Sequence, residues 1–231
     1  MPSIMVKRTP RNREDRLTSL QLDNPPGVSL AEQAYRTLEH LIVTLVLEPD
    51  MVVNERMLIE LTGMGRTPVR EAIQRLAWEG LMEVRPRSGI AVTPLDPKDF
   101  VKVLDAREGV EQVLARDAAR LAGPRDHQRF QAAADSMRKA SSADDLGRFL
   151  DADKALDSVL GQAAGNAFAA RLAAPLQTHS RRFWFRLRGD DGIAASTKAH
   201  IAMIEAILAR DPEKAIAAAG DLIRHLRTLA P

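Results

Sequence analysis

Charged and imidazole side chains stand on the apolar faces of helices predicted in the C-terminal half of the chain. Arg107 lies in the middle of one apolar stripe, with Glu111 one turn on. Asp153 lies at the centre of a second stripe with Asp157 as its i+4 neighbour, and His200 lies among Met and Ile side chains of a third. An ion is costly to remove from water unless it gains a partner. These charges therefore predict either a structural ion-pair network, with Arg107 matched to Asp153 or Glu111, or a polar ligand pocket, which we favour.

The residue types indicate which ligands such a pocket would take. Aspartate and histidine supply oxygen and nitrogen ligands to divalent metals. The candidate metal ligands are Asp153, Asp157, His200 and His225. Arginine suits a carboxylate, because its planar fork matches two oxygens, so we expect a small organic acid as effector. The candidate effector-binding residues are Arg107, Glu111 and His179, the last of which is placed inward because its predicted stripe also holds Phe168, Leu172, Leu176 and Phe183.

A second group of residues has the spacing of a DNA-reading helix. Thr67-Pro68 predicts a helix start, with the threonine as N-cap and the proline at the first helical position, and the helix runs to about Gly80. One side of this helix is apolar, and the other carries Arg66, Thr67, Arg70 and Gln74. Such a polar side offers donors to guanine edges and phosphates. A plain solvated helix face is the alternative, which the turn, the helix start and the basic hairpin together disfavour.

The elements around this helix predict a winged helix-turn-helix. Helices begin near Ser29 and Asn54, a glycine-bearing turn covers residues 62–66, and residues 82–93 predict a hairpin. Arg87 and Gly89 lie at the hairpin tip, where an arginine can enter the minor groove. From residue 99 to 229 the pattern predicts only helices, about six of them.

We therefore expect a mainly α protein in three parts. Residues 1–27 predict a disordered basic arm, residues 28–95 a winged helix-turn-helix of three helices and a β-hairpin, and residues 96–231 an all-α helical bundle that binds the effector.

Composition narrows the class further. The formal net charge of +2 is too small to indicate nucleic acid by itself, so the DNA hypothesis rests on where the charges stand. With no cysteine, disulfides and thiolate zinc sites are excluded. No apolar run approaches the roughly 20 residues of a membrane span, and residues 1–27 lack the apolar core of a signal peptide. We expect a cytoplasmic protein that does not enter the membrane.

Residues 30–95 resemble the DNA-binding domain of the GntR family of bacterial regulators. The resemblance is carried by residues 54–58, 65–76, 79–81 and 85–89. It implies that the operator is contacted by Arg56, Arg66, Thr67, Arg70 and Gly89. Gly65 departs from the family pattern, because many members carry Ser or Thr there, so a phosphate-binding hydroxyl is missing.

Residues 99–229 resemble the FCD (FadR C-terminal) domain of the same regulators, through residues 107–111, Asp153 with 163–166, and residues 200–211. Many members bind a divalent metal through one aspartate and three histidines, which implies a metal of the Zn, Ni or Mn class here. Asp153 and His200 match two of these positions. Asp157 replaces one histidine and Leu222 the other, with His225 one turn later. The resemblance also implies a homodimer that reads two half-sites about one helical turn apart.

Together these features predict a sequence-specific DNA-binding transcriptional regulator, which we expect to be a repressor, rather than an enzyme. A hydrolytic metalloenzyme that uses Asp153, Asp157 and His200 is one alternative, but no HExxH motif or glycine-rich phosphate loop is present. An architectural DNA-binding protein whose helical half only dimerises is another. The inward charges argue against it.

Overall fold

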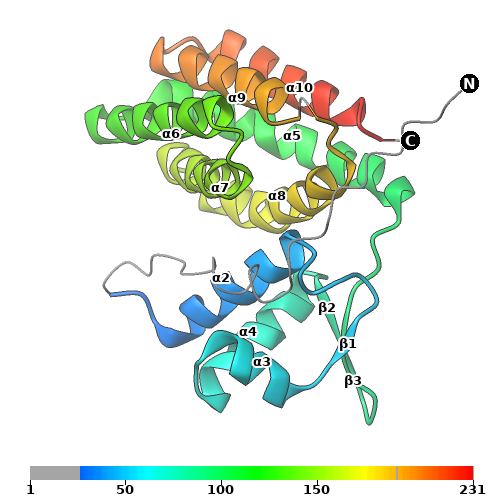
Figure 1. Ribbon diagram of the computed structural model, residues 1–231. Helices are drawn as coiled ribbons and strands as arrows, with labels where there is room; N and C mark the ends of the chain where they lie inside the picture. Colours follow the sequence, from blue (N-terminus) through cyan, green and yellow to red (C-terminus); the bar gives the residue numbers. More distant parts are fainter. Residues whose placement is uncertain (1–26, 191, 231) are drawn as a thin grey trace, which may run out of the picture. The chain divides into compact units, whose positions relative to one another are not determined.

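The computed structural model describes residues 27–190 and 192–230, so the predicted arm over residues 1–27 lies outside the described part apart from Gly27. The chain divides into two compact units between Thr93 and Pro94. No described helix is long and apolar enough to cross a membrane. Figure 1 labels the helices and strands of both units, and each unit has its own core of buried side chains.

The first unit holds three described helices and a small antiparallel sheet. The elements are α2 (Leu30–Val43), β1 (Val52–Val53), α3 (Glu55–Thr62), α4 (Arg66–Trp78), β2 (Met82–Arg85) and β3 (Gly89–Val92). The strand order is β1-β3-β2. The predicted hairpin is therefore present, and β1 adds a third strand that the sequence pattern did not predict. In its register Val52 pairs with Ala91 and Val53 with Ile90.

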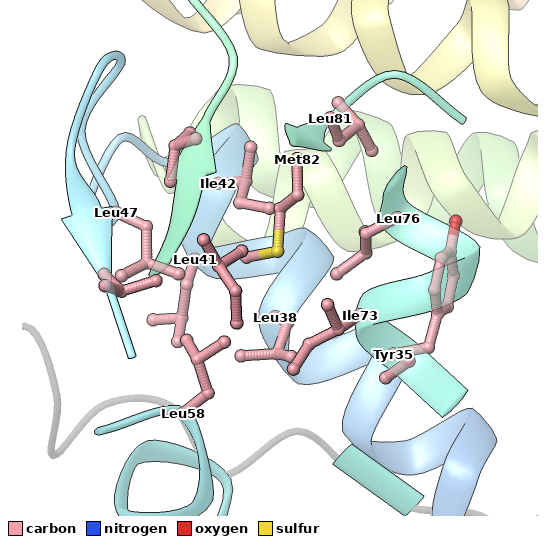
Figure 2. Packing of buried hydrophobic residues seen from close by; sticks show 14 of the residues in the cluster. Tyr35, Leu38, Leu41, Ile42, Leu47, Leu58, Ile73, Leu76, Leu81 and Met82 are labelled. Atoms are coloured by element: carbon pink, nitrogen blue, oxygen red, sulfur yellow. The ribbon is translucent and has the colours of Figure 1, made fainter. Parts of the chain in front are cut away.

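The core of this unit lies where α2, α3 and α4 meet the sheet (Figure 2). Leu38, Leu58 and Leu76, one from each helix, are fully buried. A buried leucine of this kind stabilises the fold by about 1.5–3 kcal/mol. A polar contact at the rim also joins α2 to α4, because Arg75 stacks over the Tyr35 ring at 3.5 Å and pairs with Glu32 at 2.7 Å. These contacts fix α4 so that its other side is available for recognition.

The second unit consists, in the residues that the structure describes, of six helices. They are α5 (Pro97–Leu121), α6 (Pro124–Ser142), α7 (Leu146–Ala163), α8 (Ala167–Leu187), α9 (Gly192–Leu208) and α10 (Pro212–Arg227). Side chains of Asp96, Asp145, Asn166 and Asp211 cap the starts of α5, α7, α8 and α10. The mainly α fold with a winged helix-turn-helix and a helical bundle is confirmed.

Helix α5 packs against α8 and α10, while α7 contacts α5, α6 and α8. Two aromatic pairs pack in this interior. Phe100 stacks on Phe183 with ring centroids 5.1 Å apart, and the ring centroids of Phe149 and Trp184 are 4.9 Å apart. Because Trp184 also donates to Ser196 Oγ of α9 at 2.8 Å, side chains from α5, α7, α8 and α9 converge in the interior of this unit.

Candidate functional site

Helix α4 presents the predicted DNA-reading face to solvent. Its inner side buries Val69, Ala72, Ile73 and Leu76. Its outer side exposes Arg66, Thr67, Arg70 and Gln74. The Arg66 and Arg70 side chains are 71% and 59% exposed, so their guanidinium groups are available to a nucleic acid. The structure therefore brings these four predicted residues onto one face.

The start of α4 differs from the prediction. Gly65, not Thr67, is the N-cap, and no side chain caps the helix. Pro68 is tolerated inside the first turn because backbone N–H groups there have no partner within the helix in any case. Thr67 therefore lies in the first turn with its side chain exposed. The open N-terminus leaves N–H groups suited to a phosphate.

Glu55, on the neighbouring helix α3, pairs with both exposed arginines of α4. One of its carboxylate oxygens lies 3.1 Å from Arg66 Nε and the other lies 2.7 Å from Arg70 Nε. Arg56 is exposed and pairs with Glu60 at 2.9 Å. Arg56 was predicted from the sequence and Glu55 was not. The sequence signal for Glu55 was the alternation of acidic and basic residues along α3, in the order Glu55, Arg56 and Glu60.

The hairpin tip is held by two residues with positive φ, Arg87 (φ 65°) and Gly89 (φ 96°). A Cβ atom at Gly89 would lie 2.9 Å from the Val53 carbonyl oxygen, so only glycine allows β1 and β3 to approach here. Arg87 is exposed at the turn between β2 and β3. Gly89 thus has a structural role that is independent of any contact with DNA.

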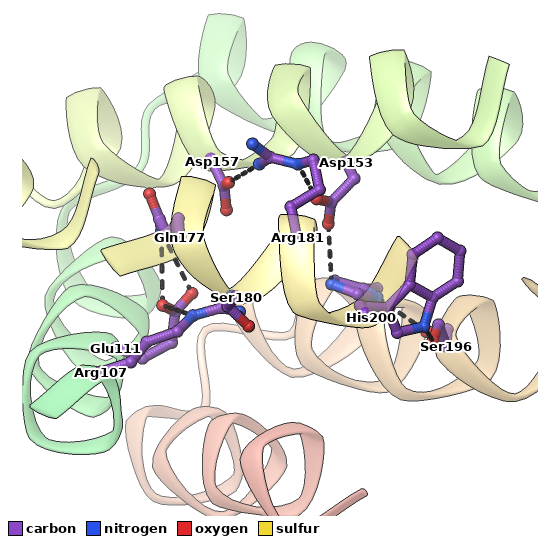
Figure 3. A network of polar contacts seen from close by, with 10 residues as sticks. Arg107, Glu111, Asp153, Asp157, Gln177, Ser180, Arg181, Ser196 and His200 are labelled. Carbon is purple, nitrogen blue, oxygen red and sulfur yellow. Dashed lines mark hydrogen bonds and ion pairs between the residues drawn. The ribbon is translucent and has the colours of Figure 1, made fainter. Parts of the chain in front are cut away.

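The second candidate site is a buried ion-pair cluster in the helical unit (Figure 3). Arg107 pairs with Glu111 at 2.9 Å and donates to Ser180 Oγ at 3.0 Å. Gln177 Nε2 donates to Glu111 at 3.3 Å. Arg107 is 5% exposed and Glu111 is fully buried. Of the two partners predicted for Arg107, Glu111 is therefore the one in contact.

The other half of the cluster is built around Arg181 of α8. Its Nε donates to Asp153 Oδ2 at 2.6 Å, and its Nη2 donates to Asp157 Oδ2. His200 Nε2 lies 3.0 Å from Asp153 Oδ1, and His200 Nδ1 lies 2.7 Å from the Ser196 carbonyl oxygen. That carbonyl only accepts, so Nδ1 carries a proton towards it. The predicted residues Asp153, Asp157 and His200 are thus brought together around an arginine.

These contacts shift the ionisation of the cluster. Burial acts to raise the pKa of Asp153, but the charge of Arg181 and the hydrogen bond with His200 lower it well below its usual range. Burial raises the pKa of Asp157 to about 7, and the charge of Asp153 acts in the same direction. Burial acts to lower the pKa of His200, but the hydrogen bond with Asp153 outweighs it and the pKa is raised. Asp153 is therefore the permanent anion of the cluster.

A small cavity lies inside the cluster, with a volume of about 20 Å³. Its polar lining includes Arg107, Asp153, Arg181 and His200. A cavity of this size holds about one water molecule. The structure thus contains the ion-pair network, which was the less favoured of the two alternatives from the sequence, together with a cavity that is much smaller than an organic acid.

Two predicted residues, His179 and His225, do not line this cavity. His179 is half-buried and does not line this cavity, because α8 turns a different face inward from the one predicted. Phe168 and Leu172, placed inward by the apolar pattern, are 77% and 63% exposed. His225 is also half-buried, and burial lowers its pKa. Among the described residues, no group of three or more His, Asp or Glu side chains is arranged to hold a metal ion.

The inward face of α8 is polar, which is why the apolar pattern missed it. Its buried residues include Gln177, Thr178, Ser180, Arg181 and Arg182. The cluster residues that were not predicted are Gln177, Ser180, Arg181 and, on α9, Ser196. The available signal was the density of polar residues between Gln177 and Arg182, which is unusual on a helix predicted to be buried.

Comparison with known protein families accounts for both units. Residues 102–227 match the model of the FCD domain, and residues 30–92 match the model described as bacterial regulatory proteins, gntR family. A relative from Agrobacterium vitis, an HTH-type transcriptional regulator in the TAR-I ttuE-ttuC' intergenic region, is 30% identical over 102 residues, which are 44% of this chain and 60% of the relative. The HTH-type transcriptional regulator YdhC of Bacillus subtilis (strain 168) is 32% identical over 83 residues, 36% of each chain.

Solved structures show the same fold. McbR/YncC of E. coli superposes with a TM-score of 0.74 at 18% identity, covering 87% of this chain and 97% of its own. A GntR transcriptional regulator from Rhodococcus sp. RHA1 superposes with a TM-score of 0.66 at 18% identity, covering 87% and 98%. The matching families and relatives are transcription regulators and not enzymes. The chain therefore belongs to the GntR family of DNA-binding transcription regulators, in the group that carries an FCD domain.

Proposed function

We propose that this regulator binds a specific operator through α4 and the hairpin, represses transcription there, and is released by a small carboxylate-bearing metabolite that binds the helical unit. One observation carries the DNA part: Arg66, Thr67, Arg70 and Gln74 share the exposed side of a helix whose other side is buried. In the major groove the two arginines would each bond a guanine edge, and Gln74 would reach a further base. Arg56 and the open start of α4 would bind phosphates, and Arg87 the minor groove.

The test begins with an operator selected from random duplexes by the full-length protein. We expect Arg70→Ala to weaken specific binding about 10- to 100-fold and to relax preference at one base position. Fluorescence anisotropy at fixed salt, with the selected and a scrambled duplex, measures both effects. Lys102→Ala is the control, because the Lys102 side chain is 76% exposed and belongs to the helical unit. It should leave the affinities for the selected and the scrambled duplex unchanged. If the Arg70→Ala variant discriminates between the selected and the scrambled duplex as well as the wild type does, α4 is not the helix that reads the operator.

The effector part rests on the buried cluster. Arg107, Arg181 and His200 line its cavity and are donors suited to carboxylate oxygens. Because the cavity holds about one water molecule, an organic acid has to separate existing ion pairs to enter. Its binding would therefore favour an opened state of the bundle, which is the differential affinity that a switch requires.

A panel of three- to six-carbon mono- and dicarboxylates tests this part, first by thermal shift of the protein and then by anisotropy with the selected operator. A compound that stabilises the protein and releases DNA supports the proposal. If no compound in the panel changes operator affinity, the cluster is a structural network.

We also propose that the regulator acts in the cytoplasm as a homodimer. Support comes from three exposed apolar side chains near the start of α8 and the end of α5. Leu121, Phe168 and Leu172 are 63%, 77% and 63% exposed, and Leu121 and Phe168 border the same surface hollow. A second copy of the chain would cover this apolar patch, since exposed patches of this kind mark interaction surfaces.

A further inference from the structure

The guanidinium of Arg181 stands where the residue types predict a divalent ion. Asp153 and Asp157, one turn apart on α7, both direct their Oδ2 oxygens at Arg181, through Nε and Nη2 respectively. Figure 3 shows this guanidinium between the two carboxylates. Because the two aspartates are one helical turn apart, the planar guanidinium of a single arginine reaches both carboxylates. Arginine thereby provides the positive charge that the carboxylates need when buried.

A divalent ion does not fit beside this guanidinium. Any ion that used the same oxygens would lie within a few ångströms of a group that cannot lose its proton in a protein. The Arg181 side chain is 6% exposed, so it cannot turn into solvent without a rearrangement of α8. His200 is also engaged, because its two nitrogens contact Asp153 and the Ser196 carbonyl.

We propose that Arg181 is the resident cation of this cluster and excludes a divalent metal from it, so that the regulator works without one. Asp153, Asp157 and His200 then serve to hold Arg181 beside the cavity rather than to bind an ion. The two carboxylates and the imidazole retain the donor types of a metal site. Removing the guanidinium should therefore uncover such a site.

The experiment measures binding of Zn²⁺, Ni²⁺ and Mn²⁺ alone, by equilibrium dialysis of the untagged full-length chain. For the wild type we expect no stoichiometric ion and no change of the unfolding temperature on adding EDTA. The variant Arg181→His removes the fixed charge and adds a nitrogen ligand. We expect it to bind about one Zn²⁺ per chain, on the order of 100-fold more tightly than the wild type, with a rise in unfolding temperature that EDTA reverses.

Three controls locate the effect. Arg181→Lys keeps a positive charge and should still exclude Zn²⁺. Arg186→Ala removes an exposed arginine of the same helix and should behave as wild type. Adding His200→Ala to Arg181→His should abolish the gained binding, which separates the cluster from surface histidines. Circular dichroism establishes that each variant is folded.

A wild-type chain that holds about one divalent ion, lost on Asp153→Asn, overturns the proposal even if every Arg181 variant fails to fold. A folded Arg181→His variant that binds Zn²⁺ no better than wild type also overturns it, since something other than Arg181 would then exclude the ion. The assay uses neither DNA nor an organic acid. Its failure is therefore distinct from failure of the proposed function.

Discussion

Glu55 is the acidic partner of Arg66 and Arg70, the two arginines on the exposed face of α4. Its two oxygens contact Arg66 and Arg70 separately, and its own side chain is 28% exposed. Exposed ion pairs of this kind contribute only about 0–1 kcal/mol to stability. The main effect of these ion pairs is therefore to orient Arg66 and Arg70, since one carboxylate holds the two long side chains side by side before DNA is bound. Preorganised donors lose less entropy on binding.

This arrangement predicts that Glu55→Gln lowers discrimination more than it lowers affinity. The variant keeps the shape of the side chain but releases both guanidinium groups and adds one net positive charge. We expect tighter binding to scrambled DNA, a salt dependence steeper by about one, and a ratio of specific to non-specific affinity about 10-fold lower. Anisotropy across a salt series measures all three.

Glu71→Gln is the matched control, because Glu71 is exposed on α4 itself and its loss changes the net charge equally. It should raise affinity for scrambled DNA without changing the ratio. Identical behaviour of the two variants would mean that Glu55 acts only through its charge.

At the scale of elements, the hairpin depends on Gly89. Alanine there has to adopt a φ near 96° and to place its Cβ 2.9 Å from the Val53 carbonyl oxygen. We expect Gly89→Ala to lower the free energy of unfolding by about 2–3 kcal/mol and to weaken operator binding, because β1 and β3 must separate. Urea denaturation followed by circular dichroism gives the free energy.

Gly63 supplies the comparison, since it also has positive φ (66°) but a Cβ atom added there would meet no other atom within 4 Å. Gly63→Ala should therefore cost only about 1 kcal/mol, the strain of the left-handed conformation alone. Equal losses in the two variants would show that close approach of β1 and β3 contributes nothing.

The observed helices and strands show which elements could be predicted from sequence patterns and which could not. The helices and the hairpin could be predicted because their cores follow the 3.6- and 2-residue periods, and the breaks near 123, 165 and 211 mark true helix ends. Strand β1 has only two residues, too few to show a period. The inner face of α8 could not be predicted from hydrophobicity, because it faces ion pairs and buries Arg181 while Phe168 remains exposed. Arg107, Asp153 and His200 were found because they interrupt apolar stripes.

At the scale of the whole molecule, the exposed face of α4 and the buried ion-pair cluster lie in separate compact units. The division between Thr93 and Pro94 falls between the two family matches, which end at residue 92 and begin at 102. The arginines proposed to read DNA belong to one unit and the ion-pair cluster to the other. Because each unit has its own buried core, substitutions in α4 should alter operator affinity without altering the cluster.

The proposed homodimer can be tested at the apolar patch of Leu121, Phe168 and Leu172. The variant Phe168→Asp places a charge in the patch at a position that is 77% exposed, so the fold of the chain itself should tolerate it. Burying that charge in an interface would be costly. We therefore expect sedimentation velocity to give a dimer for wild type and a monomer for the variant at micromolar concentration. Operator affinity should also fall, because a monomer contacts one half-site.

Trp78→Ser tests the alternative that the dimer interface lies on the DNA-binding unit, where Trp78 is 91% exposed. It should leave the dimer intact if the patch on the helical unit is the interface. A Trp78→Ser chain that sediments as a monomer, beside a dimeric Phe168→Asp chain, would move the interface to the DNA-binding unit. The half-site spacing would then be set by contacts next to α4. If the interface is the Phe168 patch, the spacing depends on how the helical unit holds the two reading units apart.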